Sequence, residues 1–485
     1  MTERRMAAWI FVLFAAIYGM TARGYLSSYD YHDRLLLTRA MVEGGTLEIE
    51  GGVRSYAGSN GASYSIYDPG ESVLLIPFYV AGRTVAEFAQ LGPTELVEQA
   101  ACSLLFPLAT ALSVALLFLV FRESTGAGRR RSFFLSCVYG LCTIAWPYSK
   151  WHAVQSIETV FLLAALLCLV LRAGPRPFRA GCFVAAGVLC RSSLLVAVPA
   201  LVWLAWSRGG WKRALQFVGP LVPAALGLLA YNHLRFGHPM ALGYGSWIAQ
   251  FSTPWLVGIS GLLLSPGRGF LFFVPTVWLL PWAWKRFRSE HSSLAIVVVG
   301  ISLGYLLFYG RFEAWYGTES WGPRYLVPLL PITLLPLAAL STVARRWLVA
   351  VAFVGVVFQV PPLVASPSLY FRSLDRLAAA GEVVDPIYDI RQSPLVLHWR
   401  EALDLLTDSP GQGGPAFGDV AGEIEAGHHQ LVRALPNFWF FYAKALGVSV
   451  GWVTGLMLLV AAVGSGAFWM IERSFRLDQD GDHVP

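Results

Sequence analysis

Two neighbouring stretches, YLSSYDYHDRLLLTRAMVEGGTLEIEGG at 25–52 and YSIYDPGESVLLIPFYVAGR at 64–83, follow the first strongly apolar segment of the chain. They carry the first acidic residues after that segment, Asp30 and Asp33, with His32 between them. A carboxylate at the rim of a lipid-facing cavity is costly unless it pairs or acts, so these acids are functional candidates. The alternative interpretation is that they are solvated loop residues.

The composition is that of a polytopic, all-α membrane protein. Of 485 residues, 56% are hydrophobic and only 14% charged, whereas about 25% of a soluble domain is charged. The mean hydropathy is +0.55. Basic residues give a formal net charge of +6, but they separate the apolar segments rather than gathering on one soluble face. This pattern sets a membrane topology and argues against a nucleic-acid partner.

The distribution of charge favours one topology. An uncleaved first span is predicted at Ala7–Thr21, because no clean cleavage site for a signal peptide follows it. The apolar segment Ser72–Phe88 is predicted to lie at the outer interface, since a crossing there would place Arg129–Arg131 outside. Both termini are then inside, and about twelve crossings follow. The other spans are expected near 100–121, 132–147, 156–172, 180–190, 192–206, 214–231, 269–284, 292–309, 326–341, 348–365 and 443–470.

Three regions are predicted along the chain. Residues 1–365 form the transmembrane core, which includes a first outer loop at 24–99. Residues 366–442 form an outer cap with helical patterns at 369–380, 395–406 and 420–435, too small for a typical independent domain. Residues 443–485 supply the last transmembrane helix and a cytoplasmic tail.

The absence of nucleotide-binding motifs reduces the number of possible functional classes. The sequence has no GxxxxGK[ST] and no GxGxxG between a strand and a helix, so nucleotide-driven transport is not expected. Membrane enzymes, secondary transporters and channels remain. A transporter would place its polar residues at the midplane of paired halves, whereas the charged residues here are predicted at one membrane surface. That placement favours an enzyme site at the lipid–water boundary. The converging residues are Asp30, Asp33, Asp68, Glu71, Lys150, Glu158, Arg191, Arg235, Arg268, Arg311, Glu313, Glu319 and Arg324.

Five motifs resemble the bacterial polyprenyl-phosphate-dependent glycosyltransferases of the GT-C superfold, of the protein mannosyltransferase and aminoarabinose transferase type. The first two are D-x-x-x-R-L-x-L-T-R-A-x-V-x-x-G-T-L, from Asp30 to Leu47, and Y-S-x-Y-x-P-G-x-S-x-L-x-x-P-x-Y, from Tyr64 to Tyr79. The others are YNHLRFGHPMALGYG at 231–245, GLLLSPGRGFLFFVP at 261–275 and WGPRYLVPLLP at 321–331. The resemblance extends to about residue 340 and leaves the cap without a counterpart.

The resemblance implies an inverting transfer of a sugar from a polyprenyl-phosphate carrier, such as undecaprenyl phosphate, to an acceptor hydroxyl. The reaction would occur on the outer face of the bacterial cytoplasmic membrane. In that family the Asp of the first loop is the general base, and the matching position here is Asp30. A lipid phosphate is a good leaving group, so no second, protonated carboxyl is required, unlike in glycoside hydrolysis.

Cationic side chains would stabilise the departing phosphate. The candidates are Lys150, Arg191 and Arg324, each with a structural ion pair as the alternative interpretation. Arg268 ranks lower because it could bind the carbonyl groups of its own turn.

Asp33 is the second catalytic candidate beside Asp30, and the other cavity candidates are His32, Tyr67, Glu158 and Arg268. Asp33 and Glu158 could orient the acceptor or hold a divalent cation with Asp30, although sequence spacing alone does not decide metal dependence. Tyr67 is expected to shape the loop together with Pro69–Gly70, and His32 lies between the two acids. The acceptor could be a glycan, a lipid or a protein. A ligase or polymerase of polyprenyl-linked glycans and a lipid-carrier flippase are the alternative functions.

Overall fold

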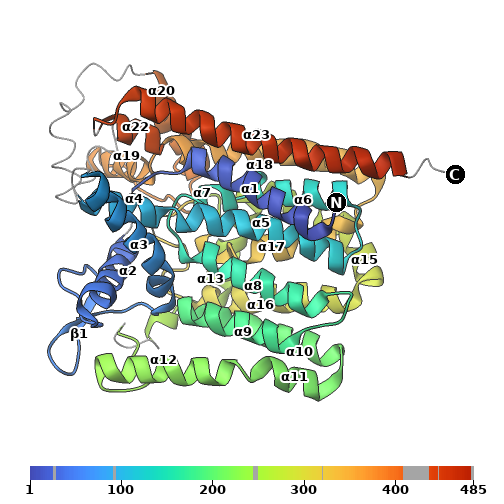
Figure 1. Cartoon of the computed structure of the whole chain (residues 1–485), viewed down its shortest axis with the longest axis horizontal. Coiled ribbons are helices and arrows are strands. Elements are labelled where there is room, and N and C mark those ends of the chain that lie inside the picture. Colours follow the sequence, from blue (N-terminus) through green and yellow to red (C-terminus); the bar gives the residue numbers. More distant parts are fainter. Residues whose placement is uncertain are drawn as a thin grey trace.

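The structure is a computed structural model that describes residues 1–25, 29–90, 94–243, 249–318, 320–407, 436–445 and 447–481. Its main body is an elongated bundle of helices that run along the long axis of the molecule (Figure 1). The bounds of these helices are α1(Glu3–Thr21), α5(Leu105–Ser124), α6(Arg129–Cys142), α7(Ala145–Tyr148), α8(Val154–Val170), α9(Pro177–Cys190), α10(Val198–Ser207), α11(Gly210–Val218), α12(Leu221–Phe236), α13(Trp255–Leu264), α14(Phe270–Phe273), α15(Leu280–Glu290), α16(Ser292–Arg311), α17(Leu329–Leu334), α18(Thr342–Val364) and α23(Val450–Gly481).

Local sequence explains where several helices begin. The side chain of Thr2 accepts a hydrogen bond from the Arg5 amide (3.3 Å) and caps α1, and Ser341 caps α18 through the Ala344 amide (3.3 Å). These hydroxyls satisfy amide groups that have no partner in the first helical turn. Proline stands at the start of α9, where its missing N–H costs nothing.

Five of the described helical segments are long and apolar enough to cross a membrane: Thr94–Ser124, Gly210–Phe236, Ser292–Arg311, Val343–Val364 and Val450–Arg476. The bundle also contains shorter apolar helices at Val154–Val170, Pro177–Cys190, Ser192–Ser207, Trp255–Leu264 and Leu329–Ala339. The chain is therefore a helical protein with the segments of a multi-pass membrane protein. The larger number of about twelve crossings stays a prediction.

The first loop forms a separate layer at one end of the bundle. It contains α2(Tyr29–Arg39), a π-helical turn η1(Ala40–Gly44), strands β1(Ser55–Ala57) and β2(Ser63–Ser65), and the helices α3(Gly70–Ala89) and α4(Thr94–Ser103). The two strands are antiparallel, with Tyr56 opposite Tyr64. The sequence analysis did not predict this hairpin. Figure 1 shows α2, α3 and β1 together at the left end of the molecule.

The predicted cap lies at the same end. It contains α19(Pro367–Ala379), α20(Pro394–Thr407) and α22(Trp439–Ala445) (Figure 1). The patterns at 369–380 and 395–406 correspond to α19 and α20, whereas the predicted helix at 420–435 lies outside the described residues. Short 3-10 turns complete the fold: η2(Ser192–Ala197), η3(Ala249–Phe251), η4(Pro275–Leu279), η5(Arg324–Leu326) and η6(Leu335–Ala339).

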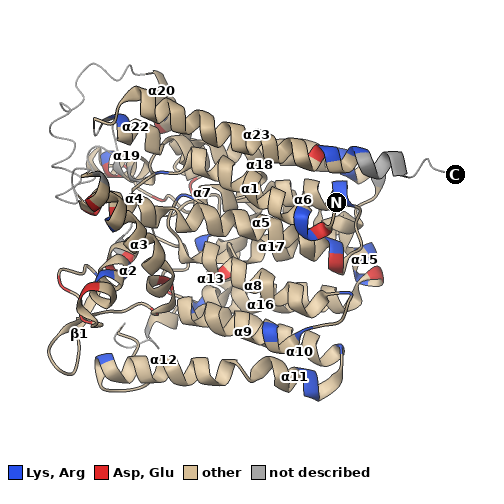
Figure 2. Cartoon of the chain, in the orientation of Figure 1, with Lys and Arg blue, Asp and Glu red and all other residues tan. Residues whose placement is uncertain are grey.

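Charge separates along the bundle, as Figure 2 shows. Lys and Arg mark the end that holds the N-terminus, α11 and α15, while acidic residues dominate the layer of α2 and β1 at the opposite end. We call these the basic end and the loop end. The membrane side that each end faces stays a prediction.

Candidate functional site

Asp30 lies in the first turn of α2 at the loop end, and its side chain is 28% exposed. The hydroxyl group of Tyr67 donates a hydrogen bond of 2.6 Å to its Oδ1 atom. The guanidinium group of Arg54, on the loop before β1, lies 3.7 Å from the same oxygen and is itself half exposed. Asp30 is thus held in place on one side and open on another. The sequence analysis had not singled out Arg54.

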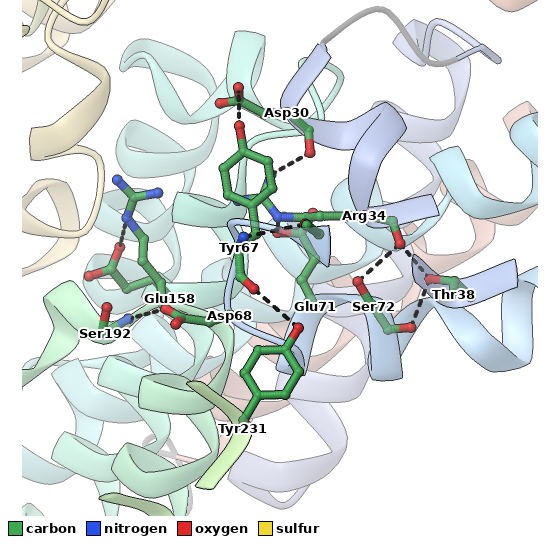
Figure 3. Close-up of polar contacts among 12 residues, drawn as sticks. Asp30, Arg34, Thr38, Tyr67, Asp68, Glu71, Ser72, Glu158, Ser192 and Tyr231 are labelled. Atoms are coloured by element: carbon green, nitrogen blue, oxygen red, sulfur yellow. Dashed lines mark hydrogen bonds and ion pairs between the residues drawn. The ribbon is translucent and has the colours of Figure 1, made fainter. Parts of the chain in front are cut away.

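Arg34 follows Asp30 by one turn of α2 and connects three groups. Its guanidinium donates to the Asp30 carbonyl oxygen (3.0 Å), lies 3.9 Å from the centre of the Tyr67 ring, and pairs with Glu71 of α3 at 3.0 Å. We call Asp30, Arg34, Tyr67 and Glu71 the rim cluster (Figure 3). The spacing of Asp30 and Arg34, four residues apart on a helix, was a sequence signal that could have revealed the connection.

Hydrogen bonds between α2 and α3 hold the rim cluster in place. The Thr38 hydroxyl donates to the Ser72 carbonyl (3.0 Å), and the Ser72 hydroxyl donates to the Arg34 carbonyl (3.0 Å). These reciprocal bonds fix the two helices against each other, so the side chains of both converge on the same spot (Figure 3).

The charges around Asp30 keep it ionised. Burial alone would raise the pKa of Asp30, but the charges of Arg324 and Arg34, the Tyr67 hydrogen bond and the charge of Arg54 together lower it below its usual value. Glu71 responds in the opposite way. It is fully buried, and burial raises its pKa to about 7, because the opposing charges of Arg34 and Arg191 do not compensate for the lost solvation.

Asp33 contacts the loop before β1 rather than a residue of the rim cluster. Its two carboxylate oxygens accept hydrogen bonds from the backbone amides of Val53 (2.9 Å) and Arg54 (2.7 Å), and the side chain is fully buried. Asp33 therefore fixes the segment that carries Arg54. Any role in the reaction stays a prediction.

A second group of polar residues lies where α8 meets the junction of α9 and η2. Glu158 accepts hydrogen bonds from Tyr305 (2.5 Å) and Ser193 (3.1 Å), and its other oxygen lies 3.6 Å from Arg191. Arg191 also donates to the Tyr309 hydroxyl (3.3 Å). We call Glu158, Arg191, Ser193, Tyr305 and Tyr309 the buried cluster, because the Glu158 side chain is only 1% exposed.

Arg324 and Tyr325 connect the two clusters. The rings of Tyr325 and Tyr309 stack at 4.4 Å with an interplanar angle of 8°. The guanidinium groups of Arg191 and Arg324 lie 5.7 Å and 4.9 Å from the centre of the Tyr325 ring. Arg324 donates to the Tyr325 hydroxyl (3.0 Å), and none of the described ion pairs involves it. Two cations thus converge on one ring, and one of them, Arg191, is paired with the buried Glu158.

The first loop is anchored to the bundle on its other side. Asp68 accepts a hydrogen bond from the Ser192 amide (2.9 Å), next to Arg191. The buried Arg235 of α12 donates to the Ser65 and Tyr67 carbonyls, and Tyr231 donates to the Tyr67 carbonyl (3.4 Å; Figure 3). Tyr67 is therefore held at both its backbone and its hydroxyl group.

The other predicted cations face backbone oxygens. The buried ammonium of Lys150 donates to the carbonyls of Leu363 (2.8 Å) and Asn437, and burial lowers its pKa well below the usual value. Arg268 donates to the carbonyls of Ser320 (2.7 Å) and Thr318 (2.9 Å), and to that of Gly267 in its own turn (3.3 Å). Arg268 thus binds a carbonyl of its own turn, as its alternative interpretation expected. Lys150 contacts carbonyl groups rather than the acidic partner of its alternative interpretation, and its phosphate-binding role stays a prediction.

The possible cation site has few ligands in the part of the chain that the structure describes. No group of three or more His, Cys, Asp or Glu side chains among those residues could hold a metal ion. His32 is half-buried beside Asp30 on α2, and no hydrogen bond of its side chain joins it to the rim cluster.

Comparisons with known proteins give little further information. No protein-family model matches the chain, and no curated protein matches it in sequence. Among solved structures it is similar to the archaeal oligosaccharyltransferase AglB from Archaeoglobus fulgidus, solved with an inhibitory peptide and a dolichol-phosphate. The match covers 92% of this chain and 56% of that chain, with 12% identity and a TM-score of 0.43. This similarity is too weak to assign a fold family or an activity.

Proposed function

We propose that this chain is a membrane glycosyltransferase of the GT-C type, which moves a sugar from a polyprenyl-monophosphate carrier to an acceptor hydroxyl with inversion. The observation that carries the proposal is the environment of Asp30. This carboxylate is partly exposed and oriented by Tyr67, and its pKa is lowered by neighbouring arginines. One of them, Arg324, forms no ion pair within 4.0 Å among the described residues and would be available to an anionic group.

The motifs that resemble the glycosyltransferase family support this proposal because their residues meet in space. Asp30, Tyr67 and Arg324 come from three of the five motifs. A fourth motif supplies Arg235, which holds the backbone around Tyr67, and the fifth supplies Arg268, which binds the carbonyls just before Arg324. Residues almost 300 positions apart in sequence thus build or support one site.

The reaction would proceed as a single displacement. Asp30 accepts the proton of the acceptor hydroxyl, whose oxygen bonds to the anomeric carbon of the donor sugar. The bond from that carbon to the phosphate oxygen breaks, and the lipid phosphate leaves with the electron pair. Arg324 and Arg191 stabilise the charge that develops on it. Attack from the face opposite the leaving group inverts the anomeric configuration.

Sugar transfer by the purified full-length chain in liposomes tests the proposal. Wild type, Asp30→Asn and a surface control, Asp389→Asn, are compared on a panel of polyprenyl-monophosphate sugars and polyprenyl-diphosphate-linked glycans. Asn keeps the size and hydrogen bonding of Asp30 but removes the base, so we expect a loss of roughly 10²–10⁴-fold with donor binding retained. Full activity of Asp30→Asn would place the base elsewhere. Consumption of only diphosphate-linked glycans would favour a ligase or polymerase, and lipid movement without donor consumption would favour a flippase.

A further inference from the structure

Three positive charges flank the turn between α10 and α11 at the basic end: Arg208, Lys212 and Arg213. The sequence contains no Asp or Glu between Glu158 and Glu290. Within the described part of the chain, none of the three side chains lies within ion-pair distance of a carboxylate, and Arg213 donates instead to the Arg208 carbonyl. The charge of this turn is therefore not neutralised by the protein.

An apolar groove lies directly beside the same turn. It encloses about 500 Å³ and is lined by residues of α10 and α11: Pro199, Val202, Trp203, Trp206, Trp211, Ala214, Leu215 and Val218. Trp206 is 53% exposed and Trp211 is 64% exposed. Because α11 belongs to a segment long and apolar enough to cross a membrane, the open apolar groove suits a lipid acyl chain, and Trp is one of the two residue types enriched where lipid headgroups meet acyl chains.

We propose that this groove binds an anionic phospholipid, with an acyl chain against the tryptophans and the phosphate group on Lys212, Arg213 and Arg208. Charge complementarity identifies the occupant. A net negative headgroup would neutralise a turn that lacks acidic partners, whereas a zwitterionic headgroup would not. Helices α10 and α11, which line the groove, extend to the end of the bundle opposite α2 (Figure 2), so the proposal does not depend on the glycosyltransferase assignment.

The basic end offers a matched control on α15. Lys285 and Arg286 are also adjacent and positively charged, but Arg286 pairs with Glu290 at 2.6 Å. Replacing both Lys285 and Arg286 changes the formal charge by the same amount as replacing both Lys212 and Arg213. It leaves the groove intact.

Native mass spectrometry of the full-length chain in detergent tests the proposal. The protein is titrated with an equal mixture of phosphatidylglycerol and phosphatidylcholine that carry identical acyl chains. We expect wild type to retain phosphatidylglycerol preferentially. Lys212→Gln/Arg213→Gln should bind it roughly thirtyfold more weakly, about five- to sixfold for each charge removed, while Lys285→Gln/Arg286→Gln should stay within about twofold of wild type.

A second variant tests the groove itself. Ala214→Phe fills the groove but keeps all three charges, and the side chain it replaces is half-buried at the surface. We expect a loss of phosphatidylglycerol binding of at least about fivefold with an unchanged gel-filtration profile. Equal retention of both lipids by wild type, equal losses in the two double variants, or unchanged binding by Ala214→Phe would each overturn the proposal.

Discussion

The rim cluster and the buried cluster each combine a carboxylate with an arginine and a tyrosine hydroxyl, but the carboxylates Asp30 and Glu158 differ in exposure. The Asp30 side chain is 28% exposed and receives one short hydrogen bond from Tyr67. The Glu158 side chain is 1% exposed and is enclosed by Tyr305, Ser193 and Arg191. The first carboxylate can reach a substrate, whereas the second can act only through the groups around it.

This difference assigns different tasks to the two clusters in the proposed reaction. The rim cluster would handle the proton of the acceptor, and the buried cluster would hold Arg191 toward the donor phosphate. Tyr325 lies between them and contacts both arginines. Variants of the two clusters should therefore give different kinetic signatures.

The largest expected effect after that of Asp30→Asn comes from Arg324→Gln. It removes a cation that both lowers the Asp30 pKa and faces the proposed phosphate site. We expect a loss of roughly 10²-fold in kcat/KM and a shift of the acid limb of the pH–rate profile to higher pH. The exposed cap residue Arg391 supplies the control variant Arg391→Gln. An unchanged pH profile would show that Arg324 does not act on Asp30.

Glu158→Gln should have a smaller effect, because Glu158 would act through Arg191. The change keeps the hydrogen bonds with Tyr305 and Ser193 possible but removes the negative charge 3.6 Å from Arg191. We expect KM for the donor to rise about tenfold with little change in kcat, since the cation is displaced rather than lost. A fall in kcat alone would instead indicate that Glu158 takes part directly in the chemical step. The two clusters would then not have the separate tasks proposed above.

Tyr67→Phe tests whether Asp30 is the group whose ionisation controls activity. The ring and its contact with Arg34 stay, but the 2.6 Å hydrogen bond to Asp30 is lost. That bond favours the ionised form, so its removal raises the Asp30 pKa, and activity should disappear at a higher pH as the solution is acidified. A shift of about one unit corresponds to a hydrogen bond to a charged group. Tyr231→Phe, which affects only a backbone contact of the same residue, is the control.

The smallest expected effect is on stability alone and comes from Glu71→Gln. The folded protein raises the pKa of Glu71 from 4.5 to about 7, so the folded state binds this proton more tightly than the unfolded chain. The contribution to stability is fully present below about pH 4.5 and is lost as the pH rises toward 7. Thermal unfolding in detergent should show a weaker pH dependence for Glu71→Gln across this window. Parallel curves for the two proteins would contradict the raised pKa.

The helices were largely predictable because hydrophobicity and charge mark them directly. The segment at 72–88 lies within helix α3, and the two spans expected at 180–190 and 192–206 meet at the junction of α9 and η2. The hairpin of β1 and β2 was missed because its strands have three residues each and carry no apolar alternation. Hydrophobicity patterns in a sequence identify long apolar elements far better than short polar ones.

The residues of the candidate site could be named from the sequence, but their partners could not. Asp30, Tyr67, Glu158, Arg191 and Arg324 were all candidates, yet Tyr67 is 37 positions from Asp30 and Tyr305 is 147 positions from Glu158. Such pairings depend on how α2 packs on α3 and α8 on its neighbours, which sequence spacing does not encode. The roles of Tyr325 and Arg34 became visible only with the geometry.

The contacts of the buried Lys150 ammonium constrain the order in which the chain can fold during its synthesis. Its acceptors are the carbonyls of Leu363 and Asn437, and Asn437 also accepts from Arg23 just after α1 (2.8 Å). Asn437 follows Lys150 by 287 residues, which a ribosome adds in about 15 to 60 s. Throughout that interval the contacts of Lys150 and Arg23 with Asn437 cannot form. Final closure of the bundle is therefore a late event of biosynthesis, completed by the segment that leads into the last helix.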